Sequence, residues 1–146
     1  MAIPVLKWAG GKRQLLDELY KRFPEEYTQY HEPFFGGGAL FFDLEPMEAS
    51  INDTNARLIN FYIQVRDCPH GLSELRLKFD DPEADPDPEH DYSKTKKKRR
   101  GSKNDFYQQQ ELFNNPTYWD EYDPIVEAAL ILYLNRTCYN GLYREN

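Results

Sequence analysis

The chain has 146 residues, 40% of them hydrophobic and 15% aromatic, which is enough apolar side chain to build one ordinary domain. Its formal net charge of -7 argues against a protein that simply coats nucleic acid, because such proteins bind by neutralising phosphates. Neither a signal-peptide pattern after Met1 nor an apolar run of the roughly 18 residues that a membrane span needs is present, so we expect a cytoplasmic protein.

The first predicted helix follows the sequence WAGGK, and Pro24 ends it. Apolar residues recur there at helical spacing and predict one buried face, made of Leu15, Leu16, Leu19, Tyr20 and Phe23. A short strand is predicted next, over 27–32. The glycines of FFGGG then allow the backbone to turn tightly before a helix over 39–44.

A second strand is predicted over 49–53, and it ends in the acid Asp53. The order is therefore strand, glycine loop, helix and strand, which is typical of the first half of a nucleotide-binding βαβ unit. An amphipathic helix follows, with one apolar face made of Leu58, Ile59, Tyr62 and Val65.

Helices alone are predicted beyond residue 66, over 72–79, 105–113 and 125–134, and the last of these is apolar on nearly every side. This change of pattern is typical of a helical insertion. A charged loop over about 80–104 interrupts the helices, dense in acid and proline first and in base afterwards. We interpret it as a solvated surface loop, with non-specific contact to phosphates as the alternative.

The glycine loop and the acid after the second strand together predict a ligand site. Glycines after a strand let the main chain pass close to a ligand, and a carboxylate at the end of the next strand can accept both hydroxyls of a ribose. A glycine cluster by itself is more often a plain turn. The combination of the loop with Asp53 favours a nucleoside-containing cofactor.

The sequence KWAGGK at 7–12 provides a second candidate for the same site. Its glycine pair precedes a helix, Lys12 supplies a positive charge, and Trp8 offers a flat apolar wall. A phosphate-binding P-loop is excluded because that motif needs an earlier glycine and a hydroxyl residue after the lysine, and Arg13 stands there. A nucleotide hydrolase or kinase is disfavoured for the same reason.

Four blocks resemble, in order, those of Dam-type DNA adenine-N6 methyltransferases: PVLKWAGGK, EPFFGGGAL, INDTNARLINFY and LYLNRTCYNGLYREN. The resemblance implies an α/β fold, namely part of a Rossmann-like S-adenosylmethionine-dependent methyltransferase domain with a helical DNA-recognition insertion. It implies that residues 1–60 belong to the cofactor-binding catalytic domain. Residues 61–146 would form the helical target-recognition region.

The same resemblance implies which residues bind S-adenosyl-L-methionine. Trp8 and Lys12 would line its methionine and carboxylate side, and Asp53 would hold the ribose hydroxyls. The FxGxG of the glycine loop would cradle the cofactor with Phe34, Gly36 and Gly38. The alternatives are a core aromatic for Trp8, a solvated charge for Lys12 and a helix N-cap for Asp53.

The closing block implies a DNA-reading hairpin that acts on duplex DNA. Tyr139 and Asn140 would fill the gap left by a flipped adenine, Leu142 would wedge against bases, and Arg144 would reach a guanine edge. From the residues alone, an asparagine and glycine followed by an apolar residue is also an ordinary hairpin turn.

Activating an exocyclic amine requires, in this family, an Asp-Pro-Pro-Tyr sequence, and the chain has no Pro-Pro dipeptide. The sequence NPTY at 115–118 is only an imitation, with Thr in place of the second proline. We therefore expect no catalytic residue and a chain that is inactive alone, namely a truncated N-terminal part of an adenine methyltransferase. The alternatives are one half of a split methyltransferase, completed by a C-terminal half, and a catalytically dead fragment that binds cofactor or DNA. Cys68 and Cys138 lack metal-site spacing, so no metal is expected.

Overall fold

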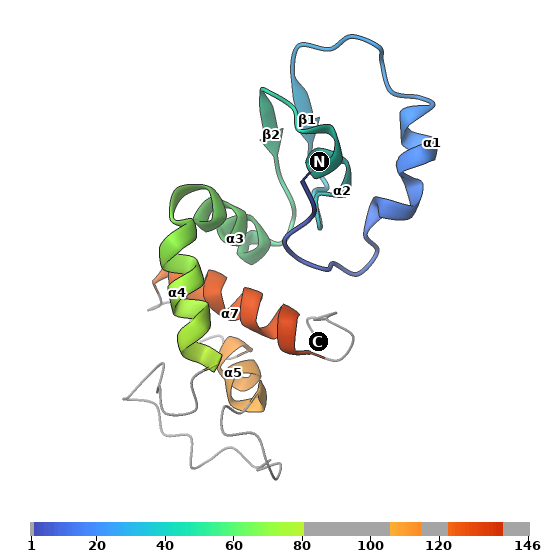
Figure 1. Ribbon diagram of the computed structural model, residues 1–146. Helices are drawn as coiled ribbons and strands as arrows, with labels where there is room; N and C mark the ends of the chain where they lie inside the picture. The colour runs from blue at the N-terminus through green and yellow to red at the C-terminus, as the bar shows by residue number, and fades with distance from the viewer. Residues whose placement is uncertain (1, 81–105, 115–122, 139–146) are drawn as a thin grey trace.

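A computed structural model describes residues 2–80, 106–114 and 123–138, and it arranges them in two neighbouring parts (Figure 1). One part contains the strands, the glycine loop and the first two helices. The other is a group of four helices. Among the described residues the fold is therefore a mixed one with a small parallel sheet.

The two strands β1 (Tyr30–Glu32) and β2 (Ala49–Ile51) pair in parallel, with His31 opposite Ser50. Helix α2 (Ala39–Leu44) connects them, which confirms the predicted order of strand, glycine loop, helix and strand. Both strands are shorter than predicted. Residues 27–29 make no ladder, and beyond the strands the pairing continues only as single backbone bonds, such as Phe35 N–H to the Asn52 carbonyl at 2.9 Å.

The glycine loop lies between β1 and α2 and turns through left-handed backbone. Gly36 has φ 54° and Gly38 has φ 67°, a region in which side chains with a Cβ are strained. A Cβ on Gly38 would also overlap the ring of Phe35, which is 1% exposed. The loop therefore needs glycine for both backbone conformation and space.

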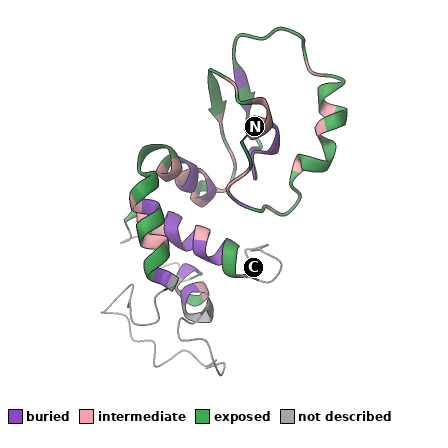
Figure 2. Ribbon diagram, viewed as in Figure 1, coloured by how far each residue is buried: buried purple, intermediate pink, exposed green. Residues whose placement is uncertain are grey.

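The first predicted helix forms only in part, as the 3-10 turn η1 (Lys12–Leu15) and the short α1 (Leu16–Tyr20). The expectation that its apolar face is buried is wrong for the described residues, since neither element contains a buried residue. Leu15 is 53% exposed, while the ring of Tyr20 contacts that of Phe23 at the surface. Figure 2 shows α1 exposed or intermediate along its length, with no buried residue.

The four helices of the second part are α3 (Ala56–Asp67), α4 (Pro69–Asp80), α5 (Phe106–Phe113) and α7 (Pro124–Thr137). All four were predicted, with ends within a few residues. α7 packs against the other three, and it is buried over most of its length as expected (Figure 2). Side chains cap two of them: Asn55 accepts from Leu58 N–H and Asp123 from Ile125 N–H.

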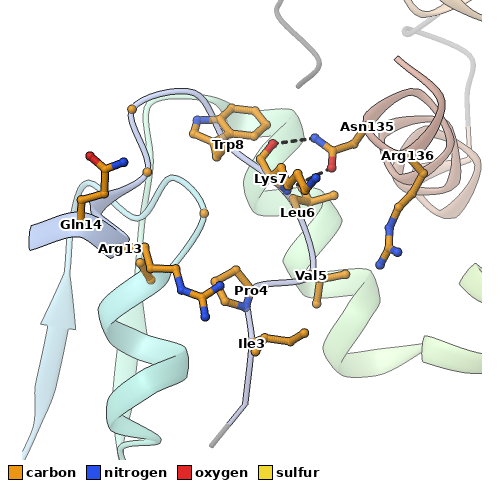
Figure 3. Close-up of a pocket in the computed structure, with 14 residues that line it drawn as sticks. Ile3, Pro4, Val5, Leu6, Lys7, Trp8, Arg13, Gln14, Asn135 and Arg136 are labelled. Carbon is orange, nitrogen blue, oxygen red and sulfur yellow. Dashed lines mark hydrogen bonds between the residues drawn. The ribbon is translucent and has the colours of Figure 1, made fainter. Parts of the chain in front are cut away.

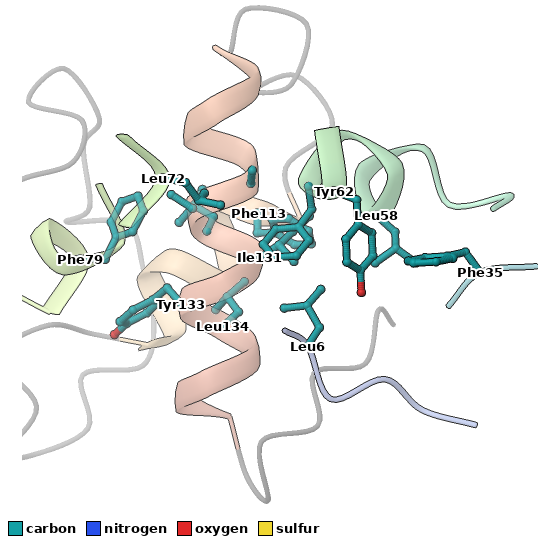
Figure 4. Close-up of a cluster of buried hydrophobic side chains, with 14 residues drawn as sticks. Leu6, Phe35, Leu58, Tyr62, Leu72, Phe79, Phe113, Ile131, Tyr133 and Leu134 are labelled. Atoms are coloured by element: carbon teal, nitrogen blue, oxygen red, sulfur yellow. The ribbon is translucent and has the colours of Figure 1, made fainter. Parts of the chain in front are cut away.

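One hydrophobic cluster joins the two parts (Figure 4). Leu6 and Phe35 come from the strand and loop part, and they lie beside Leu58 and Tyr62 of α3. The ring of Phe35 meets that of Tyr62 edge-on, with 4.7 Å between centroids. The glycine loop is thus seated on the helices through Phe35. Among the described residues, no helix is long and apolar enough to cross a membrane, and no cluster of side chains could hold a metal ion.

Candidate functional site

The extended segment before η1 crosses the glycine loop, and the indole of Trp8 lies against the loop's backbone. A Cβ on Gly36 would come 3.3 Å from Trp8 Cδ1, and one on Gly37 would come 3.2 Å from Trp8 Cβ. The Trp8 carbonyl accepts a bond from Gly11 N–H at 3.1 Å, so the WAGG turn fixes the indole in place. Trp8 is half-buried and packs at the edge of the core, and it also lines a pocket.

Lys12 and Glu32 form an ion pair beside the loop. Lys12 Nζ donates to Glu32 Oε1 at 2.9 Å and to the Phe34 carbonyl at 2.5 Å. Glu32 is only 7% exposed, and its other oxygen accepts from the Tyr30 hydroxyl at 2.6 Å. Burial, and then the bond to Glu32, raise the pKa of Tyr30 well above its ordinary range. Lys12 is therefore a paired charge and not a freely solvated one.

Asp53 connects the end of β2 to the glycine loop. Its Oδ2 accepts from Gly36 N–H at 2.8 Å, and its Oδ1 accepts from Asn55 N–H at 3.0 Å. The N-cap of α3 is Asn55, so the interpretation of Asp53 as a helix cap is wrong. The carboxylate thus lies at the carboxyl end of the strands, where ligands bind in open α/β sheets.

The hydroxyl of Tyr62 is buried below this site and has no hydrogen-bond partner within the described residues. Burial first, and then the negative charges of Glu32 and Asp53, raise the pKa of this phenol. Tyr62 therefore remains protonated at physiological pH, and its hydroxyl is a donor without a partner among the described residues.

A pocket of about 830 Å³ lies beside Trp8, between the N-terminal segment and the end of α7 (Figure 3). Lys7, Arg13 and Arg136 line it, and none of its lining residues is acidic. In a chain with a net charge of -7, this makes the pocket a locally basic surface. At its edge Asn135 bonds to the backbone of Lys7.

The structure brings most of the predicted cofactor residues into one neighbourhood. Trp8 contacts Gly36, Gly36 bonds to Asp53, and Lys12 bonds to the carbonyl of Phe34. The side chain of Phe34 is 71% exposed, so only its backbone takes part in these contacts. Gly38 begins α2 and faces the Phe35 ring.

The predicted DNA-reading residues lie outside the described residues: Tyr139, Asn140, Leu142 and Arg144. The charged stretch at 81–104 and the sequence NPTY at 115–118 do so as well.

Sequence reasoning assigned no role to Glu32 or Asn135, although both are buried and polar. A signal was available for each. Glu32 is an acid at the end of β1, as Asp53 is just after β2. Asn135 is an amide within an otherwise apolar run of α7.

A strand, a glycine loop, a helix and a second parallel strand followed by an acid is an arrangement that occurs in nucleotide-binding α/β proteins. Sequence comparison specifies the family. The D12 class N6 adenine-specific DNA methyltransferase family matches residues 8–146. The chain belongs to this family, as its four sequence blocks indicate.

Curated relatives give the same result. The chain is 40% identical to the Type II methyltransferase M1.LlaDCHI of Lactococcus lactis subsp. cremoris, over 98% of this chain and 44% of the relative. It is 36% identical to the DNA N-6-adenine-methyltransferase of Escherichia phage P1, over 97% of this chain and 16% of that relative. It is 34% identical to the DNA adenine methylase of Haemophilus influenzae, over 98% of this chain and 43% of that relative. The chain thus spans less than half the length of these relatives.

Proposed function

We propose that the chain is the N-terminal part of an enzyme that transfers methyl from S-adenosyl-L-methionine to adenine N6 in duplex DNA. The observation that carries the proposal is the carboxylate of Asp53, held against the glycine loop by Gly36 N–H in a member of this family. In this proposal residues 1–60 are part of a Rossmann-like cofactor domain. Residues 61–146 are a helical region that recognises the target DNA.

Asp53 is suited to hold a ribose even though two backbone amides already use it. A carboxylate offers about four lone-pair sites. The bonds from Gly36 and Asn55 occupy one site on each oxygen, which leaves one on each for the two vicinal hydroxyls. The amides also fix the orientation of the carboxylate, so little conformational entropy is lost when a ligand binds.

The remaining cofactor contacts are assigned by position. Trp8 forms an apolar wall over the loop, and Lys12 provides the positive charge for the carboxylate of the methionine moiety. Glu32 and the Phe34 carbonyl position that ammonium from two sides. Gly36 and Gly38 keep the loop free of side chains where the cofactor passes. The bound cofactor would supply a methyl group activated by its sulfonium.

The DNA contacts follow the last helix in the chain. Tyr139 and Asn140 would replace the lost stacking and pairing of a flipped adenine, Leu142 would wedge between bases, and Arg144 would read a guanine. These residues come soon after α7, whose Arg136 contributes to the basic pocket. A positive surface there suits the approach of a polyanion to a chain that is acidic overall.

In this proposal the residues that activate the adenine amine lie outside these 146 residues. The chain has no Asp-Pro-Pro-Tyr sequence to accept the hydrogens of the adenine amine. A C-terminal half carrying that sequence would complete the enzyme. The alternative is a catalytically dead fragment that binds cofactor or DNA, which the shortness of the chain relative to its relatives also fits.

The cofactor assignment is tested by calorimetric titration with S-adenosylhomocysteine. Asp53→Asn keeps an oxygen near the loop amides but removes the charge from two charge-assisted bonds, each worth about 1.5 to 3 kcal/mol at most. We expect affinity to fall at least about tenfold, and Trp8→Ala, which removes no backbone partner, to weaken binding as well. The matched control Asp43→Asn removes a charge from α2, where Asp43 bonds the exposed Tyr20.

Equal affinity for the wild type, Asp53→Asn and Trp8→Ala would contradict the site. Melting temperatures of the variants separate a damaged loop from a lost ligand contact.

The need for a partner is tested by transfer of labelled methyl groups to duplex DNA. We expect no incorporation by the chain alone, and incorporation after addition of the C-terminal half of a relative containing Asp-Pro-Pro-Tyr. A version of that half with Asp changed to Ala is the control. Incorporation by the chain alone would show that the missing sequence is not required.

A further inference from the structure

Asn135 joins two segments that are distant in the sequence through a pair of hydrogen bonds. Its Oδ1 accepts from Lys7 N–H at 3.0 Å, and its Nδ2 donates to the Lys7 carbonyl at 2.7 Å (Figure 3). The side-chain amide therefore pairs with one residue's backbone as a neighbouring strand would. Asn135 is 2% exposed, so its amide is shielded from water, while Lys7 on the other side of the contact is exposed.

The two ends of this contact are close in the sequence to residues of the two proposed ligand sites. Lys7 directly precedes Trp8, the wall that lies on Gly36 and Gly37 of the glycine loop. Asn135 lies in the last turn of α7, where its carbonyl also accepts a bond from the Cys138 thiol at 3.4 Å. The residues assigned to DNA reading begin at the next position, 139.

The contact is all-or-none because both bonds go to the same residue. A shift of the Lys7 backbone relative to α7 breaks the two bonds together and leaves buried donors and acceptors without partners. A rigid helix transmits that shift to its own end. A contact that forms or breaks as a unit can connect two sites energetically.

We propose that Asn135 is a positioning residue that couples cofactor binding to DNA binding. It does so by fixing the Trp8 wall to the end of α7. The inference rests on the proposed function, since it assumes that Trp8 faces the cofactor and that the segment after α7 reads DNA. Asn135 itself touches neither ligand in this proposal.

The test is a thermodynamic cycle. The affinity for S-adenosylhomocysteine is measured by calorimetry with and without sheared genomic duplex DNA, which contains every short recognition sequence. For the wild type we expect DNA to change that affinity at least about fivefold, the lower end of typical couplings between sites. Asn135→Leu, similar in size and unable to bond, should reduce the change to within about twofold of none. Asn135→Asp, which keeps only the acceptor for Lys7 N–H, should give an intermediate value.

The matched control is Asn60→Leu. Asn60 is also a side-chain amide that joins elements, donating to the Pro124 carbonyl at 2.8 Å and to Glu127 Oε2 at 2.6 Å at the opposite end of α7. The Asn60→Leu variant should have a lower melting temperature. Its coupling factor, the change in affinity for S-adenosylhomocysteine that DNA causes, should stay near that of the wild type. A merely structural role of Asn135 would likewise lower stability without changing this ratio.

The outcomes separate the inference from the function on which it rests. Undetectable binding of both probes by the wild type contradicts the proposed function and, with it, any coupling. Wild-type binding with a coupling factor that Asn135→Leu preserves overturns the inference and leaves the proposed function standing. An equal loss of coupling in Asn60→Leu also overturns it, because general loosening of α7 would then be the cause.

Discussion

The two parts of the molecule are stabilised in different ways. The helical part has a continuous apolar core in which Leu58, Phe61 and Leu130 are completely shielded from solvent. The strand and loop part has three elements without any buried residue, η1, α1 and β2. Its buried apolar side chains are fewer, among them Tyr30, Phe35 and Leu40. Polar contacts supplement them, such as the ion pair of Lys12 with Glu32 and the bonds of Asp53 to backbone amides.

The helices that stabilise the fold are therefore distinct from the loop that carries the candidate cofactor site. The helices contribute most of the burial that opposes chain entropy. The glycine loop depends on them through Phe35 and on its own hydrogen bonds otherwise. Segments with few buried contacts open at low free energy, and ligand-binding loops are commonly of this kind. We therefore expect large stability effects in the helices and large binding effects in the loop.

The largest expected effect is the loss of a core ring in the helical part. Phe61→Ala should reduce the free energy of unfolding by about 3 to 5 kcal/mol, because it removes a completely buried ring and leaves a cavity. Denaturant unfolding followed by circular dichroism measures this. The control on the same helix is Ile63→Ala, whose side chain is 40% exposed and should cost far less. Similar costs for the two would mean that the helices lack a well-packed core.

The second largest loss of stability is expected in the glycine loop. Gly38→Ala and Gly10→Ala both place a Cβ on left-handed backbone, at φ 67° and 74°, which costs about 1 to 2 kcal/mol. Only the Cβ at Gly38 meets the Phe35 ring, whereas nothing lies within 4 Å of the one at Gly10.

We therefore expect Gly38→Ala to cost about 1 to 3 kcal/mol more than Gly10→Ala, as overpacking typically does. Thermal melting compares the two. Equal melting temperatures would show that Phe35 moves away freely and that the loop is not seated on the core.

The same division decides what the sequence could predict. Periodicity located all four helices of the second part, because each has an apolar face or is buried on all sides, and the ring of Tyr62 and the Leu58 side chain are buried as their stripe indicates. The order of strand, glycine loop and strand was also predictable. The helix that contains α1 was also predicted and forms in part, but the burial of its apolar stripe was not correct, because periodicity does not reveal what a face packs against.

Within the site, the sequence predicted the acid, the glycines and Trp8 but not how they connect. The pairing of Lys12 with Glu32 and of Asn135 with the Lys7 backbone depends on segments that only the fold brings together. Such contacts have no periodic signal. A polar residue in an apolar run, as at Asn135, indicates that a partner exists without identifying it.

A smaller effect is expected at the junction of the two parts. Asn55→Ala removes the acceptor for Leu58 N–H at the start of α3, and the loss of such a cap costs about 1 kcal/mol. Asp123→Ala removes the equivalent bond to Ile125 N–H at the start of α7 and should cost a similar amount. Asn55 is adjacent to the loop that carries Asp53, so only its variant should also weaken binding of S-adenosylhomocysteine. Unchanged binding, by calorimetry, would make the junction independent of the site.

The smallest effect concerns a surface contact of the strand and loop part. The Tyr20 hydroxyl donates to Asp43 Oδ2 at 2.6 Å, and this bond raises the pKa of Tyr20 from 10.0 to about 12. A pKa raised in the folded state means that folding retains the proton more tightly. The resulting stability is therefore complete below about pH 10 and is lost as the pH rises through 12.

Because Tyr20 is 40% exposed, solvent screening should keep this contribution under about 1 kcal/mol. Thermal melts of the wild type and Tyr20→Phe at pH 8 and pH 11 check it. We expect a small advantage of the wild type at pH 8 that shrinks at pH 11, while the control Tyr27→Phe, at a similarly exposed tyrosine, shows no such trend. An advantage that stays constant with pH would mean that Tyr20 contributes through its ring alone.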